Sequence, residues 1–125
     1  MFTEKEADYL HGQRLGRLAT VTADGQAHVV PTGFRLSQDG AAIEIGGHNL
    51  AQRRPLYLRN IEANPSVAFV VDDLASVNPW RARGVTIRGH AEIHADGGKR
   101  LGPGFDSMLV RITPERITSW GIDKS

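Results

Sequence analysis

The hydrophobic pattern at the start of the chain changes once. Thr3 and Glu6 have the spacing of a capping box, in which each side chain binds a free backbone amide, so they predict a short helix that ends near Gly12. From Arg14 to Thr22, apolar and polar positions alternate with a period of two. This alternation predicts a strand.

Two turns divide the next segment. Asp24-Gly25 is typical of a hairpin turn, so Ala27–Arg35 is expected to return antiparallel to the first strand. A second turn, at residues 37–40, precedes a third predicted strand at residues 42–45. The pattern therefore predicts a meander of three consecutive strands.

The middle of the chain has helical spacing. Leu50–Glu62 is predicted to be a helix, with Pro55 in the first turn of its regular part because proline lacks the N–H that later turns need. Asn64-Pro65 ends this helix. The apolar run Val67–Val71 predicts a central strand, and residues 72–83 are expected to form a loop.

The last third of the chain returns to strand patterns. Val85–His94 alternates, and Gly97–Gly104 is a glycine-rich turn. Met108–Ile112 and Arg116–Trp120 are expected to form a last hairpin around residues 113–115. Six or seven mostly hairpin-linked antiparallel strands with two short helices predict a mainly β protein, a small barrel.

Length and composition fit one domain over residues 1–125. Hydrophobic residues make up 40% and charged residues 23%, as in ordinary globular proteins. The absence of cysteine excludes disulfides and thiolate chemistry. No apolar run approaches the ~20 residues that cross a bilayer, and the first residues lack the order of a signal peptide. A cytoplasmic location is therefore expected.

The net charge is +1, so no global field draws the protein onto nucleic acid or a membrane, and neither partner is expected. Three of the fifteen basic residues are lysines, which leaves twelve arginines. A GC-rich genome explains this bias. A ligand with phosphate or carboxylate groups also explains it, because the planar guanidinium binds such groups better than an ammonium does.

One acid-free segment, residues 45–61, combines glycines, an imidazole and arginines before a predicted helix start. Backbone amides and guanidinium groups in such a place can hold a phosphate. A solvated basic helix face is the other interpretation. The candidate residues are Gly47, His48, Asn49, Arg53 and Arg54.

Two further segments are candidates for contact with a flat ligand. Val30, Pro31 and Thr32 lie in a strand that proline confines to a sheet edge or a bulge, and Gly33 permits close approach. In the loop after Pro79, Trp80 and Arg81 can stack on a ring, although a tryptophan that caps the core is the more common case.

The side chains offer no catalyst of their own. His90 and His94 are four positions apart, but they lie in a predicted strand and not on a helix, so no metal is expected. The serines lie outside a G-x-S-x-G context. We therefore assign no catalytic residue and expect a bound cofactor to supply the chemistry.

Seven motifs follow one another along essentially the whole chain: R-L-G-R-L-A-T-V (Arg14–Val21), D-G (Asp24, Gly25), V-V-P-T-G-F-R (Val29–Arg35), I-G-G-H-N (Ile45–Asn49), N-P-S-V-A-F-V-V-D-D (Asn64–Asp73), P-W-R (Pro79–Arg81) and S-W-G-I (Ser119–Ile122). In this order they resemble the pyridoxamine-5′-phosphate-oxidase-like split β-barrel flavoproteins. Within that family they most resemble the actinobacterial group described as F420-dependent, which includes a reductase of tetracycline biosynthesis.

The resemblance implies a homodimer with two cofactor sites at the subunit interface. By position, Val30, Pro31 and Thr32 would border the deazaflavin ring. Trp80 and Arg81 would come from the loop that closes over the ring. Relatives carry a Lys-rich step into the helix, whereas this chain has arginines followed by Pro55. The residues implied at the phosphate and the start of the oligoglutamate tail are His48, Asn49, Arg53 and Arg54.

The implied activity is an F420-dependent reductase that delivers hydride to an activated double bond of a small polycyclic or conjugated molecule. Two alternatives stay open. One is an FMN-dependent oxidase or reductase of the same fold. The other is a non-catalytic module that binds F420, FMN or haem.

Overall fold

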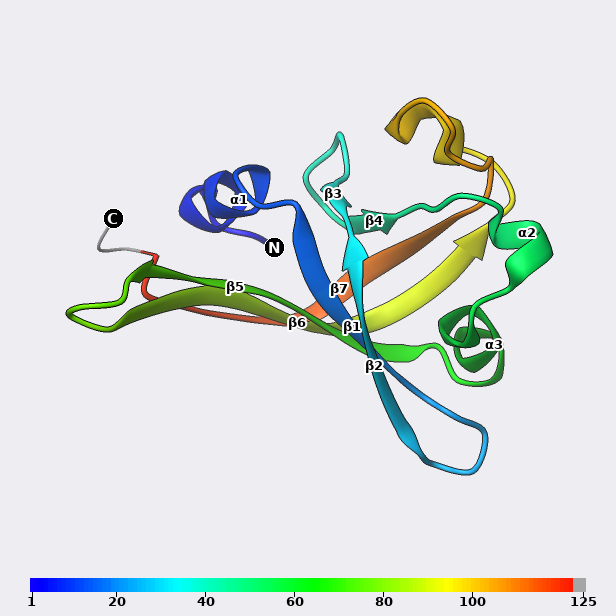
Figure 1. The fold of residues 1–125 in the computed structure, drawn as a ribbon, viewed down its shortest axis with the longest axis horizontal. Coiled ribbons are helices and arrows are strands. Elements are labelled where there is room, and N and C mark those ends of the chain that lie inside the picture. Colours follow the sequence, from blue (N-terminus) through cyan, green and yellow to red (C-terminus); the bar gives the residue numbers. More distant parts are fainter. Residues whose placement is uncertain (123–125) are drawn as a thin grey trace.

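A computed structural model of the protein describes residues 1–122, and these form seven strands, three α-helices and a 3₁₀ turn (Figure 1). Residues 123–125, the end of the predicted domain, lie outside the described part. In chain order the elements are α1 (Glu4–His11), β1 (Leu15–Val21), β2 (Ala27–Gly33), β3 (Arg35–Leu36), β4 (Ile43–Ile45), α2 (Leu50–Arg53), α3 (Leu56–Ala63), β5 (Ser66–Ser76), β6 (Arg81–His94), η1 (Gly98–Leu101) and β7 (Leu109–Trp120).

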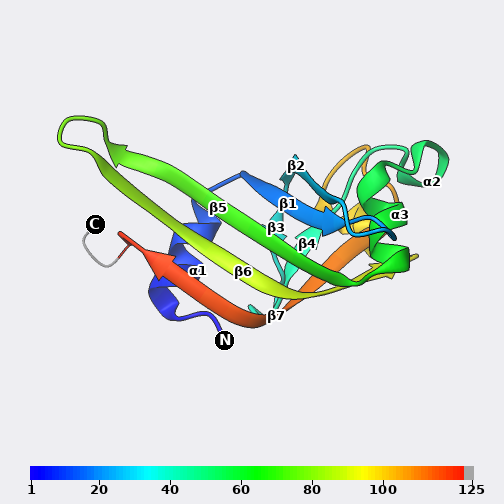
Figure 2. The ribbon, with the colours of Figure 1, turned by 90° about the horizontal axis from the view of Figure 1, so that it is seen from below.

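All seven described strands belong to one sheet in the order β2-β1-β5-β6-β7-β4-β3, and every neighbouring pair is antiparallel. Figure 2 shows β5, β6 and β7 running side by side and curving together. The sheet curls into a half-barrel, which confirms the predicted mainly β fold.

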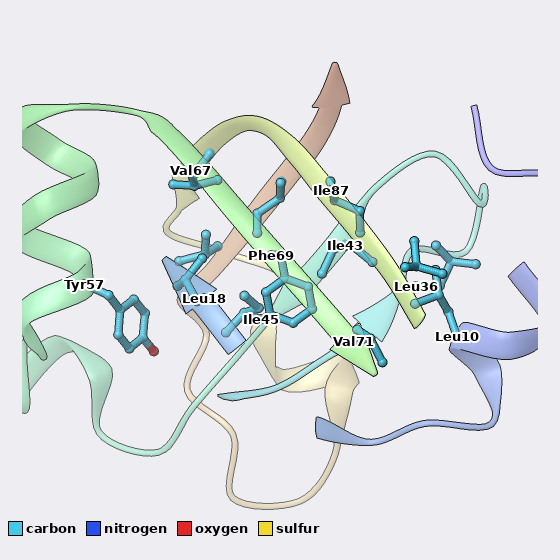
Figure 3. Close-up of a cluster of buried hydrophobic side chains, with 14 of the residues drawn as sticks. Leu10, Leu18, Leu36, Ile43, Ile45, Tyr57, Val67, Phe69, Val71 and Ile87 are labelled. Carbon is cyan, nitrogen blue, oxygen red and sulfur yellow. The ribbon is translucent and has the colours of Figure 1, made fainter. Parts of the chain in front are cut away.

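The core lies on the concave face of this sheet. Alternate residues of β1 and β5, among them Leu18, Phe69 and Val71, are almost completely buried. Figure 3 shows these side chains together with Ile87 of β6, and Tyr57 of α3 lies at one side of the cluster. Burial of this apolar area stabilises the fold by roughly 25 cal/mol per Å² and fixes where the helices pack.

The local signals at the N-terminus are confirmed. Glu6 N–H donates to Thr3 Oγ1 over 3.1 Å, and Thr3 N–H donates to Glu6 Oε1 over 2.8 Å, so the capping box is complete. The helix ends at His11 with Gly12 as its cap. The first hairpin pairs β1 with β2, and β2 forms an edge of the sheet, as Pro31 predicts.

The predicted three-strand meander is wrong in its third strand. The second strand ends at Gly33, and Phe34 turns inward to contact the Phe69 ring edge-on at 5.4 Å. The chain therefore leaves the first hairpin. Strand β4 pairs with the two-residue β3 and with β7, at the opposite side of the sheet from β2.

The predicted helix over 50–62 is two helices, so the described residues hold three α-helices rather than two. Arg54 adopts a left-handed conformation with φ of 42°, which ends α2. Pro55 then precedes the first residue of α3 and lacks an N–H to continue α2. Pro55 thus marks the start of the regular helix, as predicted.

The predicted loop over 72–83 is also wrong, because β5 and β6 continue as a long hairpin. Asp73 lies opposite Arg83, and their ion pair, with Nε and Oδ1 2.7 Å apart, joins the two strands across this segment. The turn is confined to residues 77–80, and the Asn78-Pro79 bond is cis.

The predicted last hairpin is instead one strand, β7, with a bulge. Arg88 pairs with Arg116 and Gly89 pairs with Pro114, so Glu115 is an extra residue on β7. A Cβ on Gly89 would lie 2.3 Å from Thr113 O, so glycine makes room for the bulge. Pro114 is tolerated because β4 pairs with β7 only at residues 110–112.

Candidate functional site

Two adjoining pockets lie where the end of β2 meets the segment between β4 and α2. They share four residues, Gly33, Gly46, Gly47 and His48. The first pocket has a volume of about 300 Å³ and is completed by Val30, Pro31, Thr32, Leu50, Arg53, Pro55 and Tyr57. The second has a volume of about 370 Å³ and is completed by Arg14, Phe34, Arg35, Glu44, Leu101 and Phe105.

The edge strand β2 forms one wall of the first pocket. Val30 and Thr32 face the core side of the strand, opposite Leu18 and Gly16 of β1. Thr32 Oγ1 is buried without a hydrogen-bond partner among the described residues. Buried hydroxyls in proteins are normally paired, so this oxygen fits a polar group of a ligand in the pocket.

The segment between β4 and α2 forms the opposite wall and is held tightly. A Cβ on Gly46 would lie 2.5 Å from Leu101 Cδ1, and one on Gly47 would lie 2.7 Å from Leu50 Cδ2. Asn49 adopts the left-handed conformation with φ of 60° before α2 and lines neither pocket. The glycines therefore let the backbone itself form the pocket wall.

His48 separates the two pockets and has a fixed ring. Its Nδ1 lies 2.6 Å from Gly104 O, and the ring stacks on Phe105 with centroids 4.7 Å apart. A carbonyl oxygen only accepts, so Nδ1 carries the proton and donates. In the neutral ring Nε2 is then left as the acceptor.

The two candidate arginines point to different partners. Arg53 lines the first pocket, and no described carboxylate pairs with it. Arg54 instead forms an ion pair with Glu62 of α3, which raises the pKa of the guanidinium. Only Arg53 therefore presents a free cation to the pocket.

Trp80 and Arg81 lie at the tip of the β5–β6 hairpin, at the other end of the molecule from α2 (Figure 1). Both are exposed, Trp80 to 69%. They line a separate open hollow of about 720 Å³ together with Ser76, Arg83 and Gly121. Within one chain, these two residues do not meet the others.

Six of the residues predicted from the sequence line the first pocket: Val30, Pro31, Thr32, Gly47, His48 and Arg53. Leu50, Pro55 and Tyr57 also line this pocket and were not among the predicted site residues. The second pocket was not predicted, and its residues come from four separate segments of the chain. Only the contacts of the folded chain bring those segments together.

The second pocket contains a buried carboxylate that is fully paired. Glu44 is 2% exposed and accepts two hydrogen bonds from Arg100, over 2.9 and 2.8 Å. Arg111 lies 3.5 Å from the same carboxylate. The Arg100 hydrogen bonds lower the pKa of Glu44, and burial opposes this only in part. Glu44 therefore stays ionised at neutral pH and holds η1 against the sheet.

Residues 1–122 contain no cluster of three or more histidines and carboxylates that could hold a metal ion. In the same part of the chain, no helix has the length and apolarity needed to cross a membrane.

A curled antiparallel sheet with a cleft beside its edge strand is the split-barrel class that the motifs implied. The chain belongs to the pyridoxamine 5′-phosphate oxidase family, whose model matches residues 2–121.

Among characterised relatives, the chain is 42% identical over 122 residues to the 5a,11a-dehydrotetracycline/5a,11a-dehydrooxytetracycline reductase of Streptomyces rimosus, covering 98% of this chain and 84% of that protein. Similar solved structures include HupZ of Group A Streptococcus, with 26% identity, a TM-score of 0.72 and coverage of 97% and 95% of the two chains. An FAD-binding protein of Mesorhizobium loti has the same fold, with 23% identity, a TM-score of 0.69 and coverage of 95% and 94%.

Proposed function

We propose that the protein is an F420-dependent reductase that transfers hydride to an activated carbon–carbon double bond of a polycyclic or conjugated small molecule. The observation that carries this proposal is the 42% identity, over nearly the whole chain, to a reductase named for a polycyclic dehydro compound. Membership of an oxidoreductase family supports the same class of reaction.

The first pocket has the features that a phosphate-bearing ring cofactor needs. Thr32 Oγ1 would bind a polar edge of the ring, and Arg53 with the backbone at Gly47 would hold the phosphate. When bound, F420 supplies the hydride. Asn49 and Arg54 would contribute less, because neither lines this pocket.

The protein's own part is to orient the reactants and exclude water. The edge of β2, at Val30 and Pro31, provides a flat backbone surface for the ring. Leu50 and Tyr57, both buried, form the apolar side of the pocket. A dry wall of this kind protects a transferred hydride from solvent.

Two hydroxyl groups in the pocket can hold the proton that completes the reduction. Thr32 and Tyr57 both line it. Burial raises the pKa of Tyr57, and the nearby Arg53 opposes this only in part. The phenol therefore stays protonated at neutral pH and is available as a donor, with solvent as the alternative source.

A second copy of the chain would complete the site. Cross-strand register places Leu15, Val29, Leu74 and Trp120 on the face of the sheet opposite the core, and all four are exposed, Val29 to 65%. Large exposed apolar surfaces are typical of protein interfaces. In a homodimer, Trp80 and Arg81 of one copy would reach the cofactor pocket of the other.

Titration of the purified protein with F420 and with FMN, at low and high salt, tests the cofactor assignment. We expect tighter binding of F420 and a steeper loss of its affinity with salt, because its phosphate and glutamate carboxylates pair with exposed arginines. Tighter FMN binding would favour the flavin-dependent alternative.

Measurements of turnover and of molecular mass test the proposed reaction and the proposed dimer. Reduced F420 should be oxidised in the presence of conjugated enones or quinones, and a lack of turnover across such a panel would favour a binding module. Light scattering should give a dimer, whereas a cofactor-loaded particle of 13.6 kDa would contradict the shared site.

A further inference from the structure

The second pocket differs from the first in its chemistry. We propose that it binds a flat aromatic acid, with Arg14 as the residue that binds the anionic group. This inference deepens the proposed function, and it rests on that function for the role of the acid as substrate.

Arg14 is a cation without a counter-charge. It directly precedes β1 and is exposed. It lines the second pocket, and no hydrogen-bond acceptor or carboxylate in residues 1–122 pairs with it. A guanidinium in this position is free to bind a carboxylate, an enolate or a similar anion in a bidentate way.

The other charges of the pocket do not neutralise Arg14. Arg35 donates to two backbone carbonyls, Arg100 O and Leu101 O, and so keeps its full positive charge. The one carboxylate in the lining, Glu44, is already bound by Arg100 and Arg111. The pocket is therefore electropositive and selects against cations.

The remaining walls are apolar and aromatic. Phe34 is fixed by its edge-on contact with Phe69, and Phe105 is fixed by its stacking on His48. Leu101 closes the same side. Aromatic rings in fixed positions favour a flat conjugated ligand, and a volume of about 370 Å³ is within the usual range for a small-molecule site.

The loop that carries Leu101 and Phe105 is anchored at several points. Arg100 binds Glu44, Asp106 N–H donates to Gly47 O over 2.9 Å, and Asp106 Oδ2 accepts from Ala51 N–H over 3.1 Å. The wall of the pocket is thus preformed. A preformed pocket loses less conformational entropy on binding.

The position of the pocket suits a substrate. It shares Gly33, Gly46, Gly47 and His48 with the proposed cofactor pocket. Three of these four have no side chain, so a ligand in one pocket can lie close to a ligand in the other. A reacting double bond at this boundary would meet the hydride donor.

Calorimetric titration with two matched probes tests the inference without turnover. The probes are anthraquinone-2-carboxylate and its neutral carboxamide, which differ in charge and little in shape. We expect the wild-type protein to bind the carboxylate about tenfold more tightly than the amide, as a charge-assisted hydrogen bond provides. Arg14→Gln should abolish this preference, and Arg14→Lys should retain part of it.

A control variant, Arg59→Gln, and binding measurements with the cofactors distinguish the possible results. Arg59→Gln removes an exposed arginine of α3 that lines neither pocket, and it should leave both probe affinities unchanged. Arg14→Gln should also leave F420 and FMN affinity unchanged. Equal binding of the two probes by the wild type would overturn the inference, as would a loss of cofactor affinity in Arg14→Gln, which would assign Arg14 to the cofactor. Neither result would bear on whether the protein reduces double bonds with F420.

Discussion

The Tyr9 hydroxyl donates a hydrogen bond of 2.8 Å to Asp73 Oδ1, and this contact joins the first helix to the β5–β6 hairpin. The same carboxylate accepts from Arg83 Nε over 2.7 Å and from Arg83 Nη2 over 3.0 Å. The Arg83 guanidinium also lies 5.2 Å from the centre of the Tyr9 ring. Three side chains from three elements thus support one another at the point where the hairpin leaves the half-barrel.

Removal of the Tyr9 hydroxyl is expected to weaken this support. Tyr9→Phe should lower the free energy of unfolding by about 1 kcal/mol, the usual net value of one hydrogen bond. Urea denaturation measures the change. Tyr57→Phe is the matched control, because no described group is hydrogen-bonded to its hydroxyl, and its effect should stay within about 0.5 kcal/mol. Equal losses in the two variants would contradict the role of the Tyr9–Asp73 contact.

The pairing of Glu44 makes the stability of the fold depend on pH. The Arg100 hydrogen bonds lower its pKa in the folded state, so its contribution is complete above the ordinary value of 4.5 and is lost as the pH falls through the folded-state value. Glu44→Gln should therefore lower the free energy of unfolding at pH 7. We expect a loss of about 2 kcal/mol, less than for a fully buried ion pair, because Arg100 is half exposed. The difference from wild type should shrink below pH 4.5. A difference that is constant from pH 7 to pH 3 would contradict this assignment.

The two neighbouring arginines should differ in cofactor binding. Arg53→Ala is expected to weaken F420 binding by about 1.5–3 kcal/mol, because it removes a charge-assisted hydrogen bond to the phosphate. Arg54→Ala should weaken it less than about threefold, because Arg54 is already bound to Glu62. Fluorescence titration of F420 measures both. If Arg54→Ala has the larger effect, the first pocket is assigned to the wrong ligand group.

Gly89 makes the bulge in β7 possible. Gly89→Ala should lower the free energy of unfolding by about 3 kcal/mol, because its Cβ would overlap the backbone carbonyl of Thr113 at 2.3 Å. Gly12→Ala is the control. Its nearest neighbour, Tyr9 O, would be 3.6 Å from the new Cβ, and its φ of −86° suits alanine. Thermal denaturation of the two variants should therefore differ clearly, and similar melting temperatures would contradict the steric argument.

The sequence predicted those parts of the fold that depend on neighbouring residues. The capping box at Thr3 and Glu6 and the Asp24-Gly25 turn act within a few positions, and proline alone excludes a central position for β2. Residues 72–83 were predicted as a loop that holds Pro79 and Trp80, whereas in the hairpin Asp73 is compensated by Arg83 of the neighbouring strand. Such compensation is invisible until the strands are paired.

The candidate site, like the fold, was predicted only where the signal is local in the sequence. Pro31 and His48 attracted attention through local composition, and both line the first pocket. The second pocket joins Arg14 to Phe105, ninety-one positions along the chain, and no local pattern connects them. Arg53 and Arg54 differ in direction because the left-handed conformation at Arg54 ends α2 between them, and no sequence signal predicted that conformation.

The wall that the two pockets share would link the affinities of their two proposed ligands. His48 lines both pockets and is held by the loop that carries Phe105, so a ligand in one pocket would act on a residue of the other. Linkage is reciprocal: the factor by which a first ligand changes the affinity of a second equals the factor in the reverse direction. An occupant of the Arg14 pocket that tightens cofactor binding would therefore itself be bound more tightly by the cofactor-loaded protein, by the same factor.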